Sequence, residues 1–188
     1  PSRSGAEVGD ILWVSGSIGD AGAGLRALRG EIEGSKALVE RYRLPRPRLE
    51  AGQRLAPLVS AMMDVSDGLL IDASRMAEAS GLAVTVELGD VPLSSDYIAV
   101  MGSDRAARFA AATAGDDYEL LFAAGEKNGA AISALAEEMG LSLTRIGRLD
   151  PGSGIAITLH AKEVPLPERL VYEHSQMPTA EPPPYPSA

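Results

Sequence analysis

The sequence predicts an α+β fold, in which a mixed β-sheet is covered by α-helices. Short β-prone apolar runs are interleaved with longer runs whose apolar residues recur at helical spacing. These runs do not keep the strict strand–helix–strand order of a doubly wound parallel sheet, so a mixed sheet is expected. The chain has 188 residues, which is enough for one domain with a substantial hydrophobic core.

The expected strands are short runs of apolar or β-branched residues. The run at 83–87 alternates between apolar and polar residues, as a half-buried strand does. The last two runs are separated by DPGSG, a composition typical of a hairpin loop, so they are expected to pair with each other. The expected strands are 11–14, 61–64, 82–88, 118–124, 143–149 and 155–160, with 61–64 as a buried strand that ends in a carboxylate.

The expected helices have apolar residues three or four positions apart, and most end at Gly or Pro. The clearest is 67–80, which is followed by Gly81. Asp20 and Ser103 have the side chains of helix N-caps, and a loop containing Pro92 is expected before Ser103. The expected helices are 21–28, 38–42, 49–59, 67–80, 103–114 and 130–139.

Composition excludes several classes of function. The formal net charge of −9 argues against a nucleic-acid partner, since such domains gather positive charge. No apolar run is long enough for a membrane span, so no membrane association and a cytoplasmic location are expected. With no cysteine there is no thiolate chemistry. Five prolines fall in residues 177–188, so we expect a domain at 1–176 followed by a disordered Pro-rich tail.

The densest chemical signal is the segment 64–69, DVSDGL, at an expected strand-to-helix turn. Asp64 and Ser66 would point the same way in a strand, and Asp67 would open the helix. Two carboxylates, a hydroxyl and free backbone N–H groups then converge, which suits Mg²⁺ and phosphate. Ser66 and Asp67 are equally good helix caps, and the pattern alone favours that interpretation.

A second acidic cluster, GDDYEL at 115–120, brings three carboxylates to a helix-to-strand turn. Carboxylates this close repel one another unless a cation lies among them, so a metal or a cationic substrate ring is one hypothesis. A solvated turn is the alternative, and it is favoured because acidic residues next to Gly more often lie in solvated turns. The glycine-rich segment 16–24 resembles a phosphate loop but lacks its Lys-Ser or Lys-Thr ending, so close helix packing is the preferred explanation.

Taken in order, these segments resemble the thiamine-monophosphate kinases of the aminoimidazole ribonucleotide synthetase superfamily. The resemblance covers the chain up to the tail and corresponds to the C-terminal domain of a two-domain enzyme. An N-terminal domain would precede Pro1. The matching segments are 3–6 (RSGA), 9–10 (GD), 14–16 (VSG), 19–20 (GD), 24–25 (GL), 47–48 (PR), 64–69 (DVSDGL), 115–120 (GDDYEL) and 172–174 (YEH).

The resemblance implies a role for six residues. Asp64 and Asp67 would be Mg²⁺ ligands, while Arg3 and Ser66 would contact ATP. Asp116 and Tyr172 would contact thiamine monophosphate. Asp116 stands where the family usually has Glu, Ala114 replaces the first glycine of that motif, and Ser175 stands where Phe often occurs.

The implied reaction is ATP- and Mg²⁺-dependent phosphorylation of thiamine monophosphate to thiamine diphosphate. This chain would supply the C-terminal half of the site and would be inactive alone, and the full-length enzyme would be a homodimer. The alternatives are a sibling ATPase of the superfamily with another acceptor, and a non-catalytic domain that binds nucleotide or a partner.

Overall fold

A seven-stranded mixed β-sheet organises the molecule in the computed structural model, which describes residues 1–166. The strands are β1 (Ile11–Ser15), β2 (Ala61–Asp64), β3 (Ala83–Glu87), β4 (Leu120–Ala124), β5 (Leu143–Asp150), β6 (Gly154–Leu159) and β7 (Lys162–Val164). Their order is β2-β4-β1-β5-β3-β6-β7, and only β3 and β6 pair in parallel. The predicted α+β class with a mixed sheet is confirmed.

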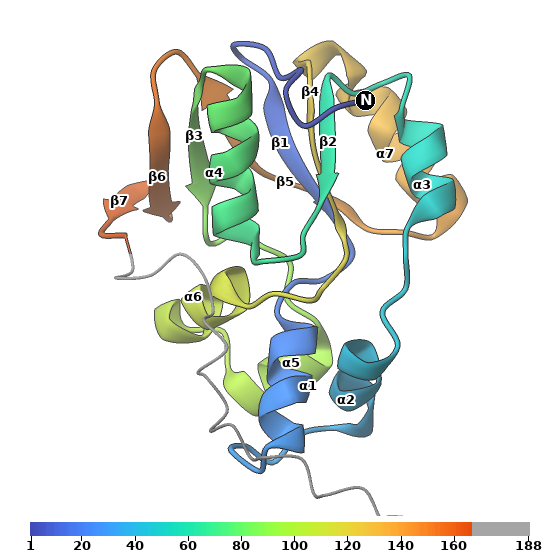
Figure 1. The fold of residues 1–188 in the computed structure, drawn as a ribbon, viewed down its shortest axis with the longest axis vertical. Helices are drawn as coiled ribbons and strands as arrows, with labels where there is room; N and C mark the ends of the chain where they lie inside the picture. Colours follow the sequence, from blue (N-terminus) through green and yellow to red (C-terminus); the bar gives the residue numbers. More distant parts are fainter. Residues whose placement is uncertain (167–188) are drawn as a thin grey trace, which may run out of the picture.

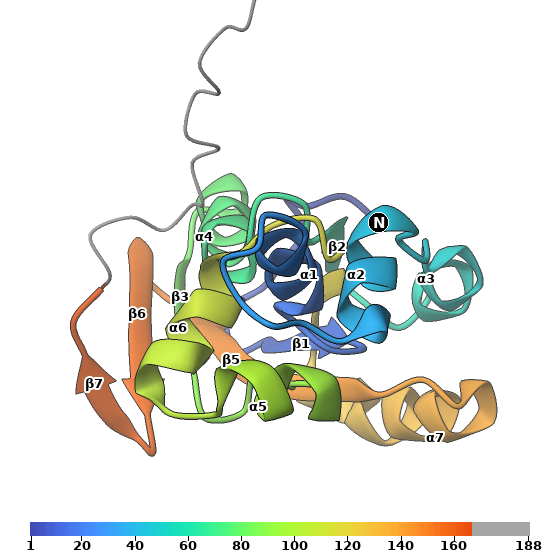
Figure 2. The ribbon, with the colours of Figure 1, turned by 90° about the horizontal axis from the view of Figure 1, so that it is seen from below.

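Helices cover both faces of the sheet and extend beyond one end of its strands (Figure 1). The helices are α1 (Asp20–Leu28), α2 (Lys36–Arg43), α3 (Leu49–Leu55), α4 (Leu69–Ser80), α5 (Ser95–Met101), α6 (Arg105–Thr113) and α7 (Gly129–Met139), with a 3₁₀ turn η1 (Glu126–Asn128). Figure 2 shows α4 on one side of the sheet and α7 on the other, while α1, α2, α5 and α6 lie at the end nearest the viewer.

Two hydrophobic clusters hold these layers together. The larger one joins α4 and the helices beyond the strand ends to the sheet, with Leu70, Met76 and Tyr97 among its fully buried members. The smaller one lies on the other face, where Trp13 and Phe122 stack with ring centroids 6.1 Å apart, and Ile132 of α7 packs there too. Trp13 is 3% exposed, so it belongs to the core. No helix within residues 1–166 combines the length and the apolar character needed to cross a bilayer.

Three expectations about the strands need correction. The runs predicted to form a hairpin do not pair, because β3 lies between β5 and β6. The segment 61–64 is an edge strand and is only partly buried, with Ala61 inside and Asp64 exposed. His160, expected at the end of a strand, lies in the turn before β7, a strand that was not predicted.

The helices differ from expectation mainly at their ends. The loop expected around Pro92 contains α5, whose N-cap is Ser94. The N-cap of α6 is Asp104 and not Ser103, since the Asp104 side chain accepts from the Ala107 N–H. The N-cap of α1 is Gly19 with a positive φ, so Asp20 is the first helical residue. The helix predicted to reach residue 59 ends at Leu55, two positions before Pro57.

Candidate active site

The turn between β2 and α4 carries Ser66 and Asp67, and it is held from inside by a buried carboxylate. Asp72, which is fully buried on α4, accepts hydrogen bonds from the backbone N–H groups of Ser66 and Asp67 at 2.9 and 3.1 Å. The N-cap of α4 is Gly68, and no side chain caps it. The interpretation of Ser66 and Asp67 as helix caps is therefore wrong.

The Asp67 side chain is half exposed and forms an ion pair with Arg75 of α4. Arg75 also binds Asp72, with 3.0 Å between Arg75 Nη1 and Asp72 Oδ1. Burial raises the pKa of Asp72, and the two backbone N–H donors oppose that shift. Arg75 and Asp72 carried no signal in the sequence beyond their helical spacing.

The second acidic loop, 115–119, alternates between outward and inward side chains. Asp116 and Tyr118 have left-handed backbones, with φ of 68° and 51°, and Tyr118 is exposed. Asp117, which lies between them, and Glu119, which follows Tyr118, are buried. The solvated-turn interpretation is wrong for these two carboxylates.

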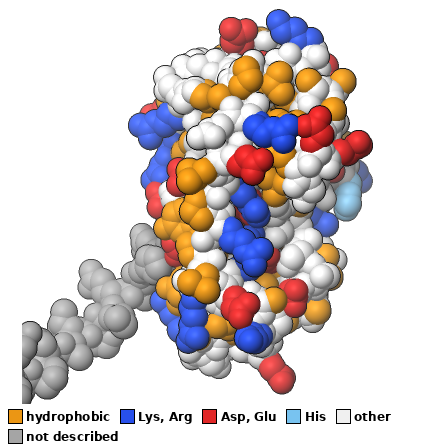
Figure 3. Space-filling model, turned by 90° about the vertical axis from the view of Figure 1, so that its right-hand side faces the viewer, with side chains coloured by type: hydrophobic (Ala, Val, Ile, Leu, Met, Phe, Trp, Pro, Cys, Tyr) orange, Lys and Arg blue, Asp and Glu red, His pale blue; other side chains and the backbone are white. Residues whose placement is uncertain are grey.

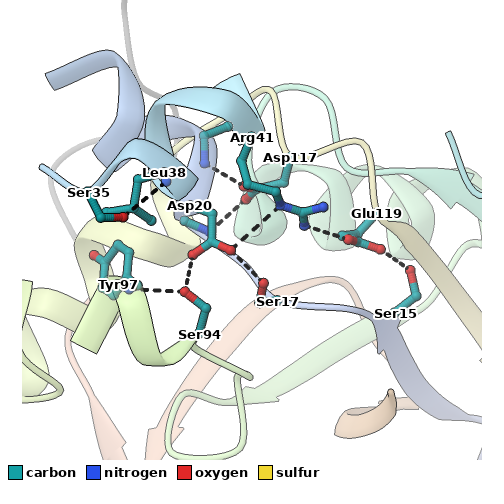
Figure 4. A network of polar contacts seen from close by, with 12 residues as sticks. Ser15, Ser17, Asp20, Ser35, Leu38, Arg41, Ser94, Tyr97, Asp117 and Glu119 are labelled. Carbon is teal, nitrogen blue, oxygen red and sulfur yellow. Dashed lines mark hydrogen bonds and ion pairs between the residues drawn. The ribbon is translucent and has the colours of Figure 1, made fainter. Parts of the chain in front are cut away.

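Asp117 binds the N-terminal end of α1. Its Oδ2 accepts from the Gly19 N–H at 2.7 Å and its Oδ1 from the Ala21 N–H at 3.2 Å. Burial raises the pKa of Asp117 to about 8, although both N–H donors favour the ionised form. Asp20, the first residue of α1, accepts hydrogen bonds from the hydroxyls of Ser17 and Ser94 (Figure 4).

Glu119 is surrounded by donors from three other parts of the chain. Its carboxylate accepts from the Ser15 hydroxyl at 2.6 Å, from Arg41 Nη2 at 2.8 Å, and from Nε and Nη2 of Arg48 at 2.8 and 2.6 Å. Burial raises the pKa of Glu119, but the hydrogen bonds from Arg48, Ser15 and Arg41 outweigh it and leave the pKa below its usual value. Two arginines of this chain thus supply cations at the acidic cluster.

The segment from α2 to the start of α3 carries four arginines, at 41, 43, 46 and 48. Figure 3 shows the face on this side of the molecule, where several basic side chains lie near the middle, interspersed with apolar and acidic ones. Arg41 and Arg48 turn inward to Glu119, whereas Arg43 and Arg46 are exposed. Helical periodicity gave no sign of the inward pair.

Backbone hydrogen bonds join the two acidic loops. The Asp116 N–H donates to the Ser66 carbonyl and the Tyr118 N–H to the Val65 carbonyl, both at 2.9 Å, and the Val65 N–H donates to the Glu119 carbonyl at 2.8 Å. Gly115 permits this close approach, because a Cβ there would lie 2.6 Å from the Ser66 carbonyl oxygen. The position of each loop depends on the other.

A cavity of about 390 Å³ opens beside these loops, between the sheet end and the outer helices. Ser66, Asp67 and Asp116 line it together with apolar side chains, and Arg26 and Glu31 also border it. The residues lining it are Gly19, Ala21, Gly22, Ala23, Leu25, Arg26, Glu31, Ser66, Asp67, Tyr97, Met101, Ala110, Thr113, Ala114, Gly115 and Asp116. A polar edge and an apolar wall suit a ligand with an ionic group and a ring.

The glycines of segment 16–24 allow close packing, as expected. A Cβ on Gly24 would lie 2.1 Å from the Leu38 carbonyl oxygen of α2, and one on Gly19 would lie 2.5 Å from the Ala111 Cβ of α6. The packing explanation is confirmed at both positions. Gly19 and Gly22 also line the cavity, so the same segment shapes its wall.

The structure brings three of the six predicted site residues together at this cavity: Ser66, Asp67 and Asp116. Asp64 lines a neighbouring cavity of about 570 Å³ with Tyr118 and Arg48. Arg3 is exposed, and its carbonyl accepts from the hydroxyl of Ser80, the last residue of α4. Arg3 lines neither cavity, whereas Pro1 lines the second one together with Asp64. Tyr172 and the predicted tail at 177–188 lie outside the described residues.

The acidic turn carries two carboxylates of the kind that bind magnesium, with Asp67 on the first cavity and Asp64 on the second. Asp64 and Asp67 offer hard carboxylate oxygens, and Mg²⁺ commonly takes only one or two of these from a protein. Within residues 1–166 no group of three or more His, Asp or Glu side chains is placed to hold a metal ion. The described residues therefore supply at most part of a coordination shell.

Fold and site together define the class of this chain. It belongs to the family of AIR synthase related proteins, C-terminal domain, whose model matches residues 7–160. Within that class its similarity is to thiamine-monophosphate kinases, as the motifs indicated. That of Caulobacter vibrioides is 37% identical over 176 residues, covering 92% of this chain and 50% of the relative.

Solved structures give the same result. The crystal structure of thiamine-monophosphate kinase from Stenotrophomonas maltophilia K279a has a TM-score of 0.78 and 36% identity, covering 87% of this chain and 54% of that one. A structure of AaThiL complexed with AMPPCP and TMP has a TM-score of 0.70 and 30% identity, covering 86% and 52%. The chain thus spans about half the length of the relatives it matches.

Proposed function

We propose that this chain forms the C-terminal half of an ATP- and Mg²⁺-dependent thiamine-monophosphate kinase. The observation that carries the proposal is the joining of the two acidic loops at one cavity, with Ser66, Asp67 and Asp116 on its edge. The AaThiL structure with AMPPCP, an analogue of ATP, and TMP supports both substrates. We further propose that the full-length enzyme is a cytoplasmic homodimer.

The reaction transfers the γ-phosphoryl group of ATP to the phosphate of thiamine monophosphate. The acceptor needs no general base, because a phosphate monoester loses its second proton at a pH of about 6. The protein must align two polyanions and offset their repulsion. Asp64 and Asp67 would hold magnesium, which when bound would supply positive charge that offsets the repulsion between the two phosphates.

Each predicted residue has a defined part in this proposal. Asp116 would contact thiamine monophosphate in the cavity, whose apolar lining includes Tyr97 and Met101. Ser66 would contact ATP from the turn between β2 and α4, which is hydrogen-bonded to the loop 115–119. Arg3 and Tyr172 remain predicted contacts of ATP and of thiamine monophosphate.

Calorimetric titration of this chain with thiamine monophosphate tests the proposal. We expect binding to the chain and a loss of about tenfold in affinity for Asp116→Asn, the effect of one lost interaction of about 1.4 kcal/mol. Asp90→Asn removes an exposed carboxylate away from the cavity and is the matched control. Absence of binding, or equal effects of the two substitutions, would refute the assignment. A panel of other phosphorylated acceptors separates the thiamine kinase from a sibling ATPase.

A further inference from the structure

The loop 115–119 holds two residues in a conformation that side chains disfavour. Asp116 and Tyr118 have φ of 68° and 51°, in the left-handed region where the Cβ of an L-residue is crowded. Neither is a glycine, and a single residue, Asp117, separates them. Such residues persist only where the surrounding structure determines the backbone, and they gather at functional sites.

The residues that alternate with them are buried carboxylates fixed to other elements. Asp117 is held by two N–H groups at the start of α1, and Glu119 by Ser15 of β1, Arg41 of α2 and Arg48 before α3. The Glu119 site is tight, since a Cβ on Gly16 would lie 2.2 Å from the Glu119 carboxylate. The Glu119 carboxylate is thus closely enclosed, and both anchors are fixed by hydrogen bonds to distant elements.

We infer that Asp117 and Glu119 are positioning residues that hold Asp116 and Tyr118 in their left-handed conformations, with Asp116 at the edge of the first cavity and Tyr118 lining the neighbouring one. Two anchored side chains that point inward fix the backbone on both sides of Tyr118 and directly after Asp116. With those anchors loosened, the loop relaxes toward extended conformations, and the Asp116 carboxylate leaves its place beside Ser66 and Asp67. The effect on ligand binding rests on the proposed function, whereas the conformational effect does not.

The backbone hydrogen bonds between the loops do not fix this geometry by themselves. They tie the Asp116 and Tyr118 N–H groups to the Ser66 and Val65 carbonyls, and the Glu119 carbonyl to the Val65 N–H, but none of them engages the Asp117 N–H, in the peptide between Asp116 and Asp117. That peptide is placed by the Asp117 side chain on α1. If the anchors had a purely structural role, substituting them would lower stability without changing the backbone conformation at positions 116 and 118.

The test uses isosteric substitutions that remove one acceptor from each anchor. In Asp117→Asn an amide NH₂ faces one of the N–H donors, and in Glu119→Gln it faces donors of Arg48 and of Ser15 or Arg41. Glu126→Gln is the control, because Glu126 is exposed and pairs with Arg145 away from the loop. Backbone φ at positions 116 and 118 is followed by NMR through the three-bond couplings between the amide and Hα protons.

We expect both variants to shift these couplings toward extended values, and the control to leave them unchanged. A thiamine monophosphate titration should show roughly tenfold weaker binding, about 1.4 kcal/mol, in the variants only. Tyr118→Gly, which removes the left-handed penalty at position 118, should increase the destabilisation caused by Asp117→Asn in a double-mutant cycle, because no strain is then released when the loop relaxes.

Each outcome decides a different question. Unchanged couplings and additive stabilities in folded variants overturn the positioning role, whatever the chain binds. If Glu119→Gln does not fold, Asp117→Asn and its cycle with Tyr118→Gly give the answer alone. If the unsubstituted chain binds no thiamine monophosphate, the proposed function fails, while the couplings still test the anchors.

Discussion

Arg48 and Glu119 form a bidentate ion pair beside the candidate site, joined by two hydrogen bonds. Arg48 Nε lies 2.8 Å from Glu119 Oε2, and Arg48 Nη2 lies 2.6 Å from Glu119 Oε1. Arg48 immediately precedes α3 and Glu119 immediately precedes β4, so the pair fixes a helix to the sheet. Arg41 adds α2 to the same carboxylate.

Replacing Arg48 with Lys should therefore destabilise the chain. Lysine keeps the charge but cannot present the planar pair of donors. We expect the free energy of unfolding to fall by about 2 kcal/mol, the range for hydrogen bonds to charged groups. Arg46→Lys, two residues away and exposed, should change it by less than about 0.5 kcal/mol in the same urea titration. Similar effects of the two substitutions would show that the pair does not hold α3 in place.

Asp117 should make stability fall as the pH rises. Burial raises the pKa of Asp117 to about 8 in the folded chain, against about 3.9 when unfolded. Between these values the folded state keeps a proton that the unfolded state has lost, so raising the pH favours unfolding. Urea titrations across this window should show that decline in the unsubstituted chain and a smaller one in Asp117→Asn. Identical pH profiles would mean that Asp117 is ionised in the folded chain.

Gly19 should tolerate alanine far less well than another glycine with positive φ. Gly19 has φ of 92° and its added Cβ would meet the Ala111 Cβ at 2.5 Å, whereas Gly81 has φ of 68° and open space around it. We expect Gly81→Ala to cost about 1 to 2 kcal/mol from backbone conformation alone. Gly19→Ala should cost about 3 kcal/mol or more, because overpacking is added. Thermal unfolding of both variants measures the difference, and equal costs would contradict the packing of α1 on α6.

The local parts of the fold were predictable from the sequence. The strand at 61–64 and the helix ending at Gly81 follow from short-range patterns, and both occur with nearly the expected bounds. The hairpin prediction failed because β3, from far earlier in the chain, inserts between β5 and β6. Loop composition carries no information about an inserted partner.

The site was predictable only in part, for the same reason. The motif residues Ser66, Asp67 and Asp116 do meet at one cavity. The burial of Asp117 was not foreseen, since its partner Gly19 is 98 positions away, and Arg41 is 78 positions from Glu119. A hint was present: in an extended run, alternate residues face opposite sides, which separates Asp116 and Tyr118 from Asp117 and Glu119.

The ion pair between Asp67 and Arg75 gives a direct test of the predicted magnesium ligand. A metal ion at Asp67 would compete with the Arg75 guanidinium for the same carboxylate. We expect Arg75→Gln to bind Mg²⁺ roughly fivefold more tightly in the presence of ATP, since a unit charge about 4 Å away contributes about 1 kcal/mol in water. Asp67→Asn should weaken binding, and Arg148→Gln, which removes a similar exposed ion pair with Asp150, should leave it unchanged. Calorimetric titration with magnesium measures all three, and an affinity that responds to neither Arg75 nor Asp67 would exclude Asp67 as a ligand.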